Sequence, residues 1–133
     1  MPTVALTEAD FETTITDNDI VLVDWWASWC GPCKMFAPIF EEAATKHDDI
    51  VFAKVDTEAQ QELAGSAGIR SIPTLMVFRE NVLLFNQAGA LPAAALDDHI
   101  PQVRAIDMDE VHKSIAEAEA SEAATEAEVS ESH

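Results

Sequence analysis

The sequence is poor in basic residues. Of its 133 residues, seven are Lys or Arg and 25 are Asp or Glu, which gives a formal net charge of −18 at pH 7. Proteins that bind the phosphate backbone of nucleic acids need a basic surface, so we expect no nucleic-acid partner. The same charge disfavours binding to anionic membrane surfaces.

Long apolar runs are also missing. Spanning a bilayer takes roughly 20 consecutive apolar residues, and every apolar run in this chain is far shorter. The first residues do not combine a basic region with an apolar stretch, so no signal peptide is predicted. We therefore expect a cytoplasmic monomer, in a compartment where thiols are kept reduced.

Cysteine is scarce as well, and the spacing of the two cysteines narrows their possible roles. The only two cysteines, Cys30 and Cys33, are separated by Gly31 and Pro32. In the loop-closure model a ring this short contributes about 2 kcal/mol, against about 3 kcal/mol for a 15-residue loop. Stability is therefore a poor explanation for the pair, and reversible dithiol–disulfide chemistry is the favoured interpretation.

Two other interpretations of the cysteines stay open, half of a zinc site and a pair of inert core thiols. Zinc normally takes four ligands, and the chain has no second Cys-x-x-Cys. The histidines are scattered and lack the paired spacing of zinc fingers: His47, His99, His112 and His133. We expect no bound metal.

Four apolar segments predict β-strands. They lie at 20–27, 50–56, 74–78 and 82–85. The first is a near-continuous run rich in β-branched and aromatic residues, which is typical of a strand buried on both faces. The last two flank a tight turn at 79–81.

Four helices are expected around these strands. They begin at Thr7, at Pro32, near Thr57 (ending before Gly68) and at Pro92. Pro38 should bend the second helix, and Pro101 should kink or divide the last one, because a proline removes a backbone hydrogen bond. The order of elements predicts one α/β domain with a mixed sheet over residues 1–106.

The composition changes after residue 106. Residues 107–133 hold nine acidic side chains and one basic one. Met108, Val111 and Ile115 could extend an apolar face for two turns, so a helical extension is expected over 107–116. Residues 117–133 have high helix propensity but little to bury, which predicts a disordered or fraying acidic tail. Binding of a basic partner by this tail is an alternative to simple solvation.

Several motifs together resemble the thioredoxin family of bacterial type. They run in the expected order from about residue 3 to residue 106: Val23–Asp24, Trp29–Lys34, Lys54, Gly68–Thr74 and Gly89–Leu91. The resemblance implies a thioredoxin fold, with a central mixed sheet of about five strands flanked by about four helices. The acidic extension is unusual for the family, as are Ser71 and the Glu80–Asn81 turn.

The position of the cysteines suggests different roles for them. Cys30 stands where a strand passes into a helix, and a thiolate at a helix N-terminus is stabilised by free N–H groups and the helix dipole. Cys30 is therefore expected to be the exposed nucleophile, and Cys33 the buried resolving thiol. Gly31 and Pro32 add no positive charge between them, which favours a reductant over an oxidant.

Asp24 is a candidate base. It lies within an apolar strand, where desolvation should raise its pKa toward neutrality. The resemblance implies that Asp24 accepts the proton of Cys33, and Lys54 on the neighbouring strand is its expected charge partner. The alternative is that Asp24 and Lys54 form only a structural ion pair.

A docking surface is implied by the resemblance. The Ile72–Pro73 peptide bond should be cis and should face the disulfide, presenting the backbone of Ser71 and Ile72 to an extended client. The expected patch around Cys30 is small and mostly apolar, which suits broad specificity. Its members are Trp29, Gly31, Pro32, Ile72, Pro73, Gly89 and Ala90.

The sequence thus predicts a general protein-disulfide reductase with no bound cofactor. The resemblance implies recharging by a flavin-dependent thioredoxin reductase that uses NADPH. The alternative is an interaction module of the same fold, whose tail binds basic partners and whose cysteines are incidental.

Overall fold

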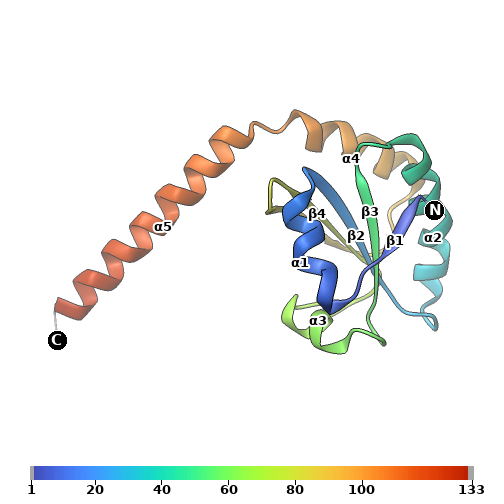
Figure 1. Cartoon of the computed structure of the whole chain (residues 1–133), viewed down its shortest axis with the longest axis horizontal. Helices are drawn as coiled ribbons and strands as arrows, with labels where there is room; N and C mark the ends of the chain where they lie inside the picture. The colour runs from blue at the N-terminus through green and yellow to red at the C-terminus, as the bar shows by residue number, and fades with distance from the viewer. Residues whose placement is uncertain (1, 132–133) are drawn as a thin grey trace.

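A mixed sheet of five strands forms the centre of the computed structural model, which describes residues 2–131 (Figure 1). The strands are β1 (Thr3–Ala5), β2 (Ile20–Trp26), β3 (Val51–Asp56), β4 (Thr74–Arg79) and β5 (Val82–Ala88). The helices are α1 (Glu8–Asp17), α2 (Gly31–Lys46), α3 (Gln61–Ser66), α4 (Ala93–Ala105) and α5 (Met108–Glu131). The mixed sheet and its thioredoxin-like order of elements confirm the predicted fold class.

The strand order is β1-β3-β2-β4-β5, so β2 lies at the centre of the sheet. Strands β1, β3 and β2 are parallel, whereas β4 and β5 are antiparallel to their neighbours. Strand β1 was not predicted, because three residues at a sheet edge carry too little pattern to identify. Strands β1 and β5 form the two edges.

Alternation along β2 builds two separate cores. Val21, Val23 and Trp25 are fully buried on the face that α1 and α3 cover. Ile20 and Leu22 are buried on the opposite face, in the cluster that contains residues of α2 and α4. A strand buried on both faces explains the continuous apolar run in the sequence.

Several helix boundaries differ from the sequence predictions. Helix α3 begins at Gln61 and not near Thr57, because the Asp56 carboxylate accepts the N–H groups of Glu58 (2.9 Å) and Ala59 (3.3 Å) and holds a turn there. Pro38 and Pro101 lie inside α2 and α4, and both helices continue past them. Pro101 therefore does not divide α4.

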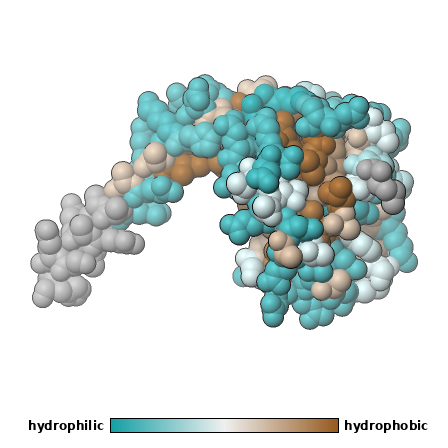
Figure 2. Space-filling model, viewed as in Figure 1, coloured by the Kyte–Doolittle hydropathy of each residue, from teal (hydrophilic) through white to brown (hydrophobic). Residues whose placement is uncertain are grey.

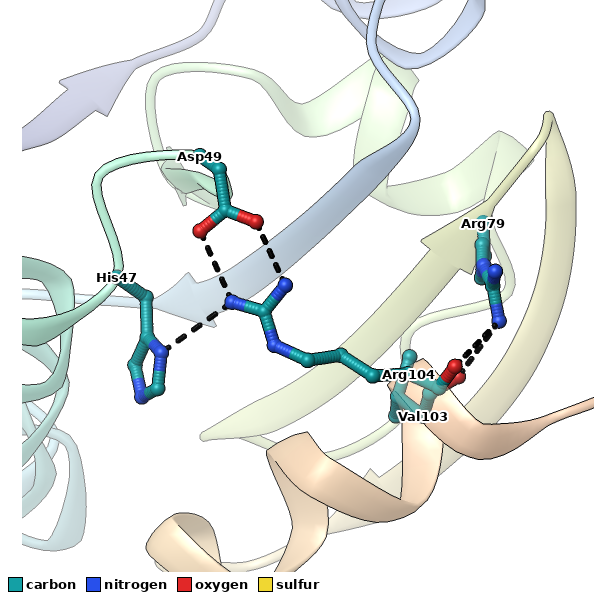
Figure 3. Close-up of polar contacts among 5 residues, drawn as sticks. All are labelled: His47, Asp49, Arg79, Val103 and Arg104. Atoms are coloured by element: carbon teal, nitrogen blue, oxygen red, sulfur yellow. Dashed lines mark hydrogen bonds and ion pairs between the residues drawn. The ribbon is translucent and has the colours of Figure 1, made fainter.

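The C-terminus of α4 is tied to the sheet by arginines (Figure 3). Arg79 Nη1 donates to the carbonyls of Val103 (3.0 Å), Arg104 (3.1 Å) and Ile106 (2.9 Å). A helix end leaves its last carbonyls short of intrahelical partners, and of these three the Val103 carbonyl also accepts the backbone N–H of Ile106 at 3.3 Å. Arg104 in turn makes two hydrogen bonds to the carboxylate of Asp49, at 2.6 and 2.9 Å.

Helix α5 projects from the body of the protein (Figure 1). It runs from Met108 to Glu131, whereas the sequence predicts helix over 107–116 and disorder over 117–133. The alanine- and glutamate-rich composition accounts for the longer helix, since both residues favour this conformation. Residues 132–133 lie outside the described part of the chain. Disorder or fraying of 117–131 in solution stays a prediction.

The surface is hydrophilic over most of the face in Figure 2, with apolar surface on the underside of α5 where this helix leaves the body. No helix within residues 2–131 is long and apolar enough to cross a membrane.

Candidate active site

Cys30 and Cys33 form a disulfide at the start of α2. Their Cα atoms are 5.2 Å apart, within the usual range for a disulfide. Cys30 is the N-cap of the 16-residue helix, and the N–H of Cys33 donates to its sulfur at 3.2 Å. The sulfur of Cys30 therefore lies at the positive end of a helix dipole, with a backbone donor directed at it.

The expected contrast in exposure between the two cysteines is absent. Cys30 is 4% exposed and Cys33 is 3% exposed, so both are buried in this oxidised state. Ala27 and Ile72 pack around them, and the carbonyl oxygen of Ile72 lies 3.6 Å from the Cys30 sulfur. The two sulfurs thus differ by their position on the helix and not by their accessibility.

Asp24 lies near the end of β2, on the strand face that α2 covers. It is fully buried, and neither carboxylate oxygen has a hydrogen-bond partner among the described residues. Burial raises the pKa of Asp24 from 3.8 to about 7; Lys54 acts against this shift and Glu41 adds to it. A carboxyl group in this state exchanges a proton near neutral pH.

Lys54 is aligned with Asp24 in the parallel pairing of β2 and β3, but the two side chains form no ion pair. The Lys54 Nζ atom lies 5.2 Å from the centre of the Trp26 ring, a cation–π contact. The structural ion pair between Asp24 and Lys54, which the sequence left open, is therefore not formed in this oxidised state. Lys54 acts on Asp24 only at longer range.

A cavity of about 250 Å³ lies beside α2, with Cys33 and Lys54 both in its lining. It connects the resolving-cysteine position to the lysine of β3 along the side of α2. Its lining residues are Trp26, Ala27, Ser28, Cys33, Lys34, Ala37 and Lys54.

Ile72, a residue of the expected docking patch, packs against the disulfide. The Ile72–Pro73 peptide bond is cis. Gly89 has a positive φ of 101° and donates its N–H to the carbonyl of Pro73 at 2.8 Å, a backbone conformation that suits glycine. Pro73 is buried, Ile72 is half-buried, and the rest of the patch is exposed: Trp29, Gly31, Pro32, Gly89 and Ala90.

Sequence reasoning missed two acidic residues at the site. The Trp29 indole is 67% exposed, and its Nε1 donates to Glu58 at 2.8 Å, which fixes the ring beside the disulfide. Glu41, on α2, contributes to the raised pKa of Asp24. Glu58 is distant from Trp29 in sequence, and Glu41 is distant from Asp24, so only the fold brings each pair together. The described residues contain no group of three or more His, Cys, Asp or Glu that could hold a metal ion.

Comparisons with known proteins agree with this site. The family model for Thioredoxin matches residues 2–102. The chain is 60% identical over 118 residues to "Putative thioredoxin 2" of Streptomyces coelicolor, covering 89% of this chain and 88% of that protein. It is 43% identical to thioredoxin 1 of Synechococcus elongatus, covering 72% of this chain and 95% of that protein. The Streptomyces match is longer than the predicted domain and includes part of the C-terminal extension.

Solved structures give the same result. A thioredoxin from Plasmodium falciparum is similar with a TM-score of 0.69 and 34% identity, covering 75% of this chain and 97% of that one. A mutant thioredoxin from Halobacterium salinarum matches with the same score and identity, covering 75% of this chain and 88% of that one. The chain therefore belongs to the thioredoxin family and is a protein-disulfide oxidoreductase.

Proposed function

We propose that the protein is a general disulfide reductase, which donates electrons to client proteins and is recharged by a thioredoxin reductase with NADPH. The observation that carries this proposal is the Cys30–Cys33 disulfide at the N-terminus of α2, together with a buried and unpaired Asp24 on the face of β2 that α2 covers. Only Gly31 and Pro32 separate the cysteines, so the helix end is the main source of thiolate stabilisation. A cytoplasmic location, as the sequence predicts, would keep client thiols reduced.

The first step is attack on the client. In the reduced protein, the Cys30 thiolate is stabilised by the Cys33 N–H and by the helix dipole. It attacks one sulfur of a client disulfide, forming a mixed disulfide while the second client sulfur leaves as a thiolate. The exposed Trp29 ring and the Ile72 backbone next to the cysteines provide the surface on which an extended client lies.

The second step releases the client. Cys33 loses its proton to Asp24 and attacks the Cys30 sulfur, so that the Cys30–Cys33 disulfide forms and the remaining client sulfur leaves as a thiolate. With its pKa raised to about 7, Asp24 is ionised often enough to accept this proton at neutral pH. Two electrons pass to the client, and the reductase returns two electrons and two protons from NADPH and solvent.

A coupled assay tests the proposal. Full-length protein, thioredoxin reductase and a protein-disulfide substrate such as insulin are mixed, and NADPH oxidation is followed. Cys30→Ser should abolish turnover, whereas Cys33→Ser should abolish turnover yet still accumulate a mixed disulfide through Cys30. Turnover that survives Cys30→Ser would overturn the mechanism, and accumulation of mixed disulfide only in Cys30→Ser would reverse the two roles.

A further inference from the structure

The first turns of α5 are held against the body by contacts far from the disulfide. Met108 is 5% exposed, and the Asp107 carboxylate accepts the N–H of Glu110 at 3.3 Å at the start of the helix. His112 Nε2 lies 3.2 Å from the carboxylate of Glu80, in the turn between β4 and β5. The helix therefore leaves the body in a defined direction beside the hairpin.

This direction creates a groove between α5 and the edge strand β5. The groove has a volume of about 440 Å³. Its lining residues are Val82, Leu83, Leu84, Glu110, Val111, Ser114 and Ile115. Leu83 is 45% exposed and Ile115 is 36% exposed, so each presents apolar surface to solvent from one wall. Figure 2 shows apolar surface on the underside of α5, beside hydrophilic surface.

One wall of the groove belongs to an acidic helix, and one carboxylate of that helix, Glu110, lines the groove. Within 107–122, the described side chains of the extension include one lysine, Lys113, and six carboxylates. The carboxylates are Asp107, Asp109, Glu110, Glu117, Glu119 and Glu122. A second copy of this chain carries a net charge of −18 and is repelled from such a surface.

We propose that the groove between β5 and α5 is a docking site for a basic polypeptide segment that carries apolar side chains. Its apolar side chains pack on Leu83 and Ile115, and its Lys or Arg side chains face the carboxylates of α5. Among residues 2–131, strand β5 pairs only with β4 in the sheet, so its other edge is available for strand addition by an extended segment. This site is separate from the disulfide and takes no part in thiol exchange.

The test uses peptides without cysteine, so its outcome is independent of the redox proposal. Two short peptides combine Leu and Lys, one with Leu at every second position and one with Leu at helical spacing. A third and a fourth replace every Lys by Glu. Each is titrated into isotope-labelled full-length protein, and the backbone amide shifts are followed by NMR. At least one Lys peptide should shift 82–84 and 110–115, and the Glu peptides should shift nothing.

Single substitutions on the two walls of the groove test whether the peptide binds there. Leu83→Ser and Ile115→Ser should each weaken the Lys peptide about tenfold or more, and added salt should weaken it further. Val4→Ser is the matched control, because Val4 is 42% exposed on the opposite edge strand β1, and it should leave the affinity unchanged. The proposal is overturned if neither Lys peptide binds, if the Glu peptides bind equally, or if Val4→Ser weakens binding as much as the groove variants.

A second copy as the occupant is a separate outcome. Sedimentation of the wild-type protein at increasing concentration should give the monomer mass. A dimer that Ile115→Ser dissociates would overturn the proposal, because the groove would then be an interface between two copies of this chain.

Discussion

Two aspartates at opposite ends of the parallel strands show how placement decides the behaviour of a carboxyl group. Asp24, near the end of β2, is fully buried without a partner, and its pKa is raised to about 7 by desolvation. Asp49, just before β3, is exposed, and its hydrogen bonds to Arg104 lower its pKa to about 2. The first can exchange protons at neutral pH, and the second serves as a permanent negative charge.

The contrast between these two carboxyl groups indicates that the two ends of the domain have separate tasks. At the disulfide end a polar group is left unsatisfied, which costs stability and provides reactivity. At the other end the arginines satisfy the carbonyls and carboxylates around the C-terminus of α4 (Figure 3).

The largest effect is expected from Asp24→Asn in client release. Removing the base should slow attack by Cys33 on the mixed disulfide by about 100-fold, while the first attack by Cys30 changes little. Rapid-quench measurement of mixed-disulfide formation and decay separates the two rates. Equal slowing of both steps would contradict the role of Asp24 as base.

The same variant should change how stability depends on pH. The native pKa of Asp24, about 7, exceeds its ordinary value of 3.8, so the native state keeps a proton that the unfolded state loses. Stability should therefore fall as pH rises through this window, by on the order of 4 kcal/mol. Asp24→Asn should remove this fall and be more stable than wild type at neutral pH, as urea unfolding at several pH values would show. A variant that keeps the wild-type slope would contradict this prediction.

The contribution of Asp49 to the pH dependence of stability should have the opposite sign. Its native pKa is lowered to about 2, so the stability that it provides is present above about 3.8 and is lost as pH falls toward 2. Asp49→Asn should therefore be less stable than wild type above about pH 4 and approach the wild-type stability as pH falls toward 2, so that the acid limb of its stability curve is flatter. Redox turnover at neutral pH should stay at the wild-type value, and a large loss of turnover would show that the two ends are coupled.

Arg79→Met tests the tie between the sheet and α4. It removes three hydrogen bonds to the carbonyls of Val103, Arg104 and Ile106, and should destabilise the protein by about 1–3 kcal/mol. Arg104→Met is the matched control, since it breaks only exposed contacts, those with Asp49 and His47, and should lower the melting temperature less. An equal loss of stability in the two variants would show that the hydrogen bonds of Arg79 to the end of α4 contribute no more than an exposed contact.

The smallest effect is expected from deleting residues 117–133. The lining of the groove between β5 and α5 ends at Ile115, and the composition of 117–133 offers little to bury. The melting temperature and reductase turnover should therefore stay close to those of the full chain. A large loss of either would show that the tail packs on the domain.

Much of the fold could be predicted from the sequence because its signals are local. The apolar run of β2 identified the central strand, and the Cys-x-x-Cys pair placed the site at the start of α2. The arrangement of the side chains at the site was harder to predict from the sequence. Register aligns Asp24 with Lys54, but Lys54 turns toward the Trp26 ring, and no sequence pattern indicates that choice.

Two other features of the site, the burial of both cysteines and a hydrogen bond of Trp29, could not be predicted for physical reasons either. The equal burial of Cys30 and Cys33 depends on how Ile72, from a distant loop, packs over the disulfide. The hydrogen bond from Trp29 to Glu58 joins two loops that are adjacent only after β2 and β3 pair. Both depend on long-range contacts, which a pattern of neighbouring residues does not encode.

We propose that burial without a partner, and not the residue type, prepares Asp24 for proton transfer. A carbon-13 NMR titration of the carboxyl groups in the oxidised protein, with Asp24 and Asp49 followed in the same sample, tests this role. We expect a pKa of about 7 for Asp24 and about 2 for Asp49. An Asp24 carboxyl that titrates near the ordinary value of 3.8 would contradict this proposal.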